Sequence, residues 1–268
     1  MSSDWGFALA TIKELRKGLS ATTVPDDFAD ALLRSASSLW LSSDNATELA
    51  ADLALCYPAL KRAEVRARAV AHDDTWRLAV ATQDRKGLLA DTAAILSVDG
   101  FSIRSASLAT WEDLDLALIA VTMTGDAPET DRLDAVGEAL RAANKGNRPT
   151  VPFEPTGRAY VRRTGVANGD DMISVVAPDQ MGLLATICRW FADAGTNIEA
   201  AWITGESEAN DVFVVSGEVD CAALERHLTL ENQGIEAVVG SMFSDARRAG
   251  ETVARNVAGF LSGLLSRK

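Results

Sequence analysis

An internal repeat is the feature that most constrains the fold of this chain. Residues 82–110 align with residues 177–205 without a gap. The aligned pairs of identical residues are Asp84 and Asp179, Gly87 and Gly182, Leu88 and Leu183, Leu89 and Leu184, Ala90 and Ala185, Gly100 and Gly195, Ile103 and Ile198, and Ala106 and Ala201. Identity kept in one register over this length predicts two copies of the same structural unit.

Each copy shows the same order of strand and helix patterns. A β-rich run ends at the turn-forming Asp, a Gly follows, and apolar residues then recur at helical spacing until the next Gly, which favours the left-handed end of a helix. We predict first strands at 76–81 and 172–176, second strands at 102–111 and 197–204, third strands at 116–123 and 212–219, and second helices at 129–143 and 220–232.

The fourth strands differ between the copies. Residues 234–243 read as a clear strand in the second copy, whereas residues 148–155 of the first contain three prolines, which cannot donate to a central ladder. We expect an edge strand and linker there. The predicted fold is α+β, with two ferredoxin-like βαββαβ modules whose sheets pair.

The domain boundaries follow from this pattern. We expect a helical N-terminal region at 1–72, a first module at 73–156, a linker at 157–170, a second module at 171–243 and a C-terminal helix at 244–268. The last segment carries an apolar seam at Ala246, Gly250, Val253, Val257, Phe260 and Leu264.

The two loops carry a resemblance to a known family. The runs D-R-K-G-L-L and D-Q-M-G-L-L, followed by G-F-S-I and G-T-N-I, resemble the ACT family of regulatory ligand-binding domains over about residues 74–243. With Leu39–Ser42 and Val65–Arg68, the chain is similar to the C-terminal regulatory region of the bifunctional uridylyltransferase/uridylyl-removing enzymes. There a tandem ACT pair senses glutamine, so the resemblance implies a role in nitrogen metabolism.

The predicted ligand is a small amino acid bound where the two modules join. A Gly allows close backbone approach, and N–H groups at the start of a helix favour a carboxylate. An aspartate or a backbone carbonyl can receive the ammonium group. From loop chemistry and the resemblance, the candidate ligand-binding residues are Asp84, Gly87, Leu88, Ser102, Ile103, Asp179, Gln180, Gly182, Leu183, Asn197 and Ile198. The Asp-x-x-Gly loops are equally compatible with plain turn and capping chemistry.

Composition excludes several other functions. The chain has 38 acidic and 26 basic residues and a formal net charge of -12, which disfavours nucleic acid as a partner. The three cysteines are widely spaced and are expected to be reduced. We expect no catalytic residue, metal or cofactor, a cytoplasmic location, and no membrane partner, since no leader or spanning run is recognisable.

Two functions remain open, and a third, an enzyme, remains only if the helical N-terminal region contains a site without a recognisable motif. The first is a regulatory sensor that binds an amino acid at the joint of the ACT modules, with glutamine as the first ligand to test, and that is not an enzyme. The alternative is a scaffold without a ligand that acts through its helices. Both readings include a homodimer, formed through the ACT sheets or the C-terminal helix, and allow a protein partner.

Overall fold

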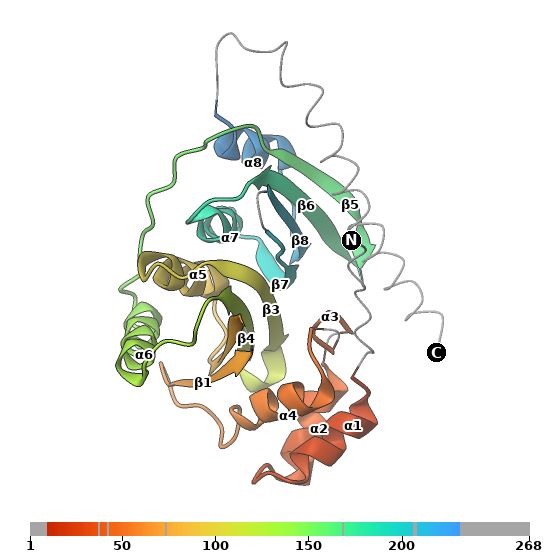
Figure 1. Ribbon diagram of the computed structural model, residues 1–268. Helices are drawn as coiled ribbons and strands as arrows, with labels where there is room; N and C mark the ends of the chain where they lie inside the picture. Colours follow the sequence, from red (N-terminus) through yellow and green to blue (C-terminus); the bar gives the residue numbers. More distant parts are fainter. Residues whose placement is uncertain are drawn as a thin grey trace. The chain divides into compact units, whose positions relative to one another are not determined.

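The chain has an α+β fold with two four-stranded antiparallel sheets (Figure 1). The computed structural model describes residues 10–36, 38–41, 43–72, 74–167, 169–205 and 208–230. Within these residues the chain divides into two compact units, one within Met1–Arg85 and Ser107–Asn147 and the other within Lys86–Ala106 and Arg148–Lys268. The first helix of the first repeat is therefore part of the second unit.

The two repeats build sheets of the same strand order. The first sheet contains β1 (Val65–His72), β2 (Thr75–Thr82), β3 (Ile103–Trp111) and β4 (Leu116–Thr124) in the order β1-β2-β4-β3. The second contains β5 (Tyr160–Ala167), β6 (Asp170–Pro178), β7 (Asn197–Trp202) and β8 (Glu208–Ser216) in the order β5-β6-β8-β7. The helices of the repeats are α5 (Leu88–Val98), α6 (Thr130–Asn144), α7 (Leu183–Asp193) and α8 (Cys221–Leu228), and η1 (Glu112–Leu114) is a short 3-10 turn.

Among the described residues, the fourth strand of each sheet precedes the repeat, which corrects the prediction of an edge strand at 148–155 in the first copy. β1 forms a hairpin with β2 in a register that runs from Val65 opposite Thr82 to His72 opposite Thr75. β5 pairs with β6 in the same way. The described elements therefore follow the order ββαββα in each copy.

Three predicted boundaries change as a result. Residues 148–155 form no strand, because their prolines lack the N–H that a ladder requires and β1 already fills the place beside β2. Residues 65–72 are a strand and not part of a helical region, and most of the expected linker at 157–170 is β5. The predicted strand at 234–243 and helix at 244–268 lie outside the described residues.

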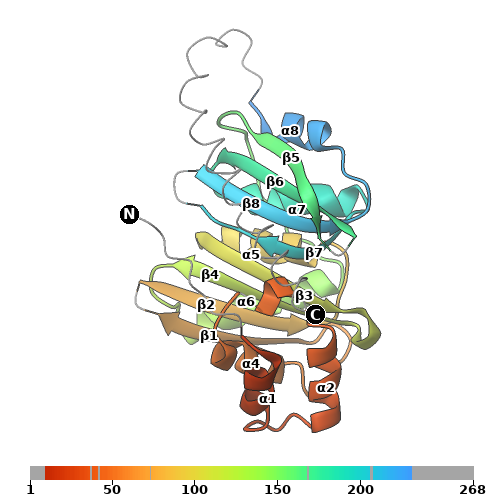
Figure 2. The ribbon, with the colours of Figure 1, turned by 90° about the vertical axis from the view of Figure 1, so that its right-hand side faces the viewer.

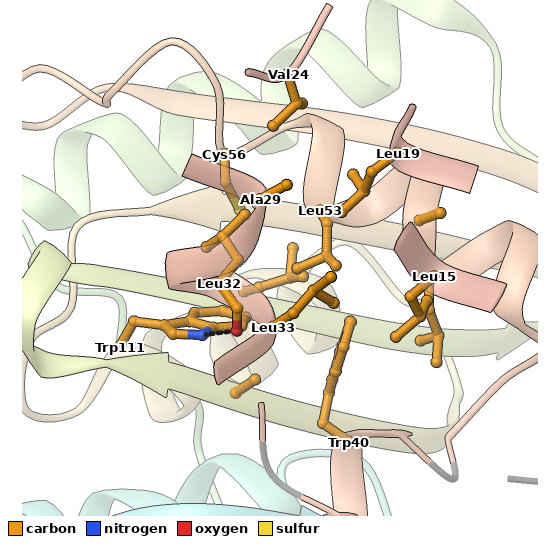
Figure 3. Close-up of a cluster of buried hydrophobic side chains, with 14 of the residues drawn as sticks. Leu15, Leu19, Val24, Ala29, Leu32, Leu33, Trp40, Leu53, Cys56 and Trp111 are labelled. Atoms are coloured by element: carbon orange, nitrogen blue, oxygen red, sulfur yellow. Dashed lines mark hydrogen bonds between the residues drawn. The ribbon is translucent and has the colours of Figure 1, made fainter. Parts of the chain in front are cut away.

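The N-terminal helices cover one face of the first sheet (Figure 2). They are α1 (Ile12–Leu19), α2 (Asp26–Arg34), α3 (Ser38–Leu41) and α4 (Ala46–Ala54). Their buried apolar side chains form one cluster with Ala81, Ala109 and Trp111 of the sheet (Figure 3). Trp111 Nε1 donates to the Leu32 carbonyl over 2.8 Å, so the indole is both packed and hydrogen-bonded.

A buried ion pair joins α4 to the same sheet. Arg77 on β2 contacts Asp52 on α4, and Arg77 Nε lies 3.0 Å from Asp44 Oδ2. Asp52 has no exposed surface and also receives Arg68 Nη1 at 3.1 Å. Because both partners are withdrawn from water, loss of Asp52 leaves the buried Arg77 with Asp44 as its remaining carboxylate among the described residues. In the described part of the chain, no helix has the length and apolar character to cross a membrane.

We predict that Asp52→Ala lowers the free energy of unfolding by about 2–4 kcal/mol, because the buried Arg77 keeps Asp44 but loses its buried carboxylate partner, and Arg68 also loses one. Urea unfolding of the full chain measures the change. Glu138→Ala is the matched control, since it removes a carboxylate from an exposed pair with Arg141 and should cost less than about 1 kcal/mol. Equal losses in the two variants would contradict this assignment.

Candidate ligand-binding site

The loop between β6 and α7 is shaped by a left-handed glycine. Gly182 has a φ of 86° and stands immediately before the first residue of α7, as Gly87 with a φ of 77° does before α5. A Cβ placed on Gly182 would lie 2.7 Å from Val151 Cγ1 and 3.4 Å from the Pro152 carbonyl oxygen. Both the backbone angle and the lack of space therefore require glycine at this position.

This loop borders a cavity of about 230 Å³ within the second unit. Asp179 to Leu184 line one side, and residues 101–103 at the start of β3 line another. Predicted site residues that meet there are Ser102, Ile103, Asp179, Gln180, Gly182 and Leu183. The loop of the second copy thus faces the β3 start of the first copy. Since water occupies about 30 Å³ per molecule in the liquid, the space suits a ligand of roughly eight to ten non-hydrogen atoms.

The contact between α5 and α7 brings these two segments together. Arg189 on α7 forms an ion pair with Asp91 on α5, which has no exposed surface. Arg148 Nε lies 3.9 Å from the other oxygen of the same carboxylate. Phe101 lies shortly after the end of α5 and Gly182 immediately before α7, so the pairing of the two helices sets the width of the cavity.

The cavity wall contains donors suited to an anion. N–H groups in the first turn of a helix have no intrahelical partner, and the helix dipole adds positive potential there. The loop is held by local bonds: Leu183 N donates to the Gln180 carbonyl over 3.2 Å, and Gln180 Nε2 donates to the Glu154 carbonyl over 3.1 Å. Because the Leu183 N–H is already used, the donors left for a carboxylate at the start of α7 are the N–H groups that follow it, beginning with that of Leu184.

Asp179 brings a carboxyl group to the same cavity. A Cβ on Gly205 would lie 2.7 Å from Asp179 Oδ2, so the carboxyl packs closely on that glycine. Although Asp179 as a residue is largely exposed, partial burial of its carboxyl raises the pKa, and a hydrogen bond from the Gln180 backbone opposes this rise.

Asp211 is a cavity residue that sequence reasoning missed. It lies on β8 with only 1 % of its surface exposed, and Thr204 N donates to its Oδ1 over 3.3 Å. Burial raises the pKa of this carboxyl well above its usual value, and the field of Asp179 adds to the rise. The sequence did contain a signal for its burial. Asp211 lies two positions before Phe213, and residues two apart on a strand point to the same face, here the face of the buried Phe213 ring.

The other predicted residues do not line this cavity. Asp84 belongs to the first unit, where its N–H donates to the Asp115 carbonyl over 3.3 Å. Asn197 Nδ2 donates to Glu199 Oε1 over 3.0 Å at the start of β7, beside the largely buried Ile198. Gly87 and the buried Leu88 open α5. Lys86 Nζ donates to the Gly195 carbonyl over 3.1 Å, so the end of the first-copy loop lies near the start of β7.

Neither a metal cluster nor a disulfide is found in the described ranges. No group of three or more His, Cys, Asp or Glu side chains is arranged to hold a metal ion there. Cys56 and Cys188 are buried free thiols, and Cys221 is a partly buried one.

Comparison with known proteins finds a relative in sequence and a similar solved structure. No protein-family model matches the chain. The chain is 30% identical over 162 residues to the bifunctional uridylyltransferase/uridylyl-removing enzyme of Vibrio campbellii, a match that covers 52% of this chain and 17% of the enzyme. The chain thus spans about a sixth of that relative. The aspartate kinase from Synechocystis is similar with 15% identity and a TM-score of 0.34 over 66% of this chain and 28% of the kinase.

We predict that Gly182→Ala destabilises the protein more than Gly195→Ala. Both glycines have positive φ, which costs an L-residue about 1–2 kcal/mol, but only Gly182 has a neighbour within the space of a Cβ. Overlap with Val151 adds roughly 1–3 kcal/mol. Chemical unfolding of both variants checks the order, and Val151→Ala in the Gly182→Ala background should restore part of the loss. Equal losses in the two single variants would contradict the packing argument.

Proposed function

We propose that this chain is a regulatory amino-acid sensor built from two ACT-type modules, and that it is not itself an enzyme. The observation that carries the proposal is the cavity lined by the Asp179–Leu184 loop and by Ser102 and Ile103. Loop chemistry predicted Asp179, Gln180, Gly182 and Leu183 of this loop as ligand contacts, and the resemblance to ACT domains implied Ser102 and Ile103. Their meeting around one cavity of amino-acid size supports that prediction.

The polar groups of the cavity match the two charges of an amino acid. The start of α7 offers N–H donors to the carboxylate, and Asp179 offers an acceptor to the ammonium group. Apolar side chains such as Phe101 and Ile203 form the remaining wall. An amino acid can therefore satisfy both ends of the site at once.

The sequence relationship supports a regulatory role in nitrogen metabolism. The matched enzyme is bifunctional, with uridylyltransferase and uridylyl-removing activities. The resemblance lies in the tandem ACT region, so glutamine is the first ligand to test. The aspartate kinase likeness, at its low TM-score, adds no weight.

A sensor must convert occupancy into a change that another part of the protein can use. Gln180 reaches the Glu154 carbonyl and Gly182 packs on Val151, so the loop touches the segment 148–157 that leads from α6 to β5. A ligand that binds one arrangement of this loop more tightly shifts the equilibrium toward it. We propose this segment as the route by which occupancy reaches the rest of the chain.

We predict that one of the twenty amino acids, with glutamine tested first, stabilises the protein in a thermal-shift screen. A ligand at a hundredfold excess over its Kd adds about 2.7 kcal/mol. Ser102→Trp should abolish the shift, because the exposed Ser102 can carry an indole into the cavity, whereas Glu218→Trp on another exposed loop should not. A shift from no amino acid would contradict the sensor and favour the scaffold, which needs no ligand.

A further inference from the structure

Asp211 stands where the first repeat has a buried isoleucine. Val80 and Val175 are equivalent positions in the two repeats, because each lies four residues before the loop aspartate, Asp84 or Asp179. Val80 pairs with Ile119 across the first sheet, and Val175 pairs with Asp211 across the second. Ile119 has no exposed surface and Asp211 has 1 %. The second repeat therefore has a carboxyl group at a core position where the first repeat has an isoleucine side chain.

The surroundings of Asp211 do not compensate for this carboxyl. Among the described residues its one hydrogen bond comes from Thr204 N to Oδ1, and Oδ2 receives none. No Lys, Arg or His is among the described residues that line the cavity, whereas Asp179 is a second acid there. A buried carboxyl without a cation costs stability. The cavity thus has two acids and room for the missing cation.

We propose that Asp211, together with Asp179, receives the ammonium group of the ligand and that binding releases a proton. In the empty site, burial and the nearby Asp179 raise the pKa of Asp211 and so favour its neutral form. When an ammonium group arrives, the Asp211 O–H bond breaks, the proton passes to water, and the carboxylate accepts an N–H hydrogen bond from the ligand. This assignment rests on the proposed function and makes Asp211 the residue that selects ligands with a cationic nitrogen.

The groups that face Asp211 set the direction of the pH effect. The negative charge of Asp179 raises the pKa of Asp211. The buried thiol of Cys188 on α7 also has a raised pKa. Neither Asp179 nor Cys188 therefore favours the carboxylate form of Asp211. A bound ammonium lowers the pKa of Asp211. Ligand affinity therefore rises with pH between the pKa of the bound state and that of the empty state, and is flat above the latter.

The raised pKa of Asp211 also makes the stability of the ligand-free protein depend on pH. A carboxyl whose pKa is raised by folding stabilises the fold below its unfolded pKa, and this contribution is lost as pH rises through the folded pKa. Asp211→Asn keeps the acceptor for Thr204 N and cannot ionise. The empty variant should therefore melt at a higher temperature than wild type at pH 8, with a smaller difference at pH 5.

The test uses isothermal titration of the full chain with L-glutamine, or with whichever amino acid gives the largest thermal shift. Repeating the titration in buffers of different ionisation enthalpy counts the protons released. We expect release of up to one proton by wild type and none by Asp211→Asn, with affinity lowered about 10- to 100-fold by loss of the charged bond. Asp193→Asn, on an exposed position of α7, is the matched control and should bind like wild type.

Two further measurements keep the outcomes distinct. Glutaramate, which is glutamine without its ammonium group, should not bind, and Asp211→Ile, which installs the residue of the first repeat, should fold and lose binding. If wild type binds no amino acid, the proposed function fails. If wild type binds but Asp211→Asn binds equally well, or the empty variant is less stable at pH 8, Asp211 is structural and the inference is overturned.

Discussion

The left-handed turn at Gly182 is the constraint on which the candidate site depends. The turn reverses the chain between β6 and α7, and Val151 leaves no room for a side chain at this position. The helix therefore begins at Leu183, and its first turn lies beside the cavity. The ion pair between Arg189 and Asp91 then holds α7 against α5 and brings the start of β3 to the opposite wall. A binding surface results from backbone geometry and one helix contact, and no catalytic constellation is required.

The repeat made much of this arrangement predictable. Short-range signals, such as the loop glycines and the apolar periodicity after them, located β2, β6, α5 and α7 close to their observed positions. The cavity residues of the second-copy loop were predicted from its turn chemistry, whereas Ser102 and Ile103 were predicted from the resemblance to the ACT family. Strand pairing is a long-range property, however, and the run at 65–72 shows no sign in its own residues that it fills the edge beside β2. The fourth strand of the first copy was therefore sought on the wrong side of the repeat.

Asp211 escaped prediction for a different reason. An Asp next to an apolar strand is typical of an exposed strand end, and only its pairing with Val175, the counterpart of Val80, shows that Asp211 is the counterpart of the buried Ile119. The cost of burying this carboxyl falls on the folded state, and a cationic ligand group would offset it. Under the proposal, the carboxyl group of Asp211 lowers the stability of the ligand-free protein and strengthens binding of the ligand. Such a trade-off is common at sites that bind charged ligands.

The most direct measurement is a crystal structure of the chain with the amino acid that stabilises it most. The account predicts ligand density in the cavity between Ser102 and Gly182, with the carboxylate at the start of α7 and the nitrogen at Asp179 and Asp211. Ligand density at another place, with this cavity filled only by water, would contradict it.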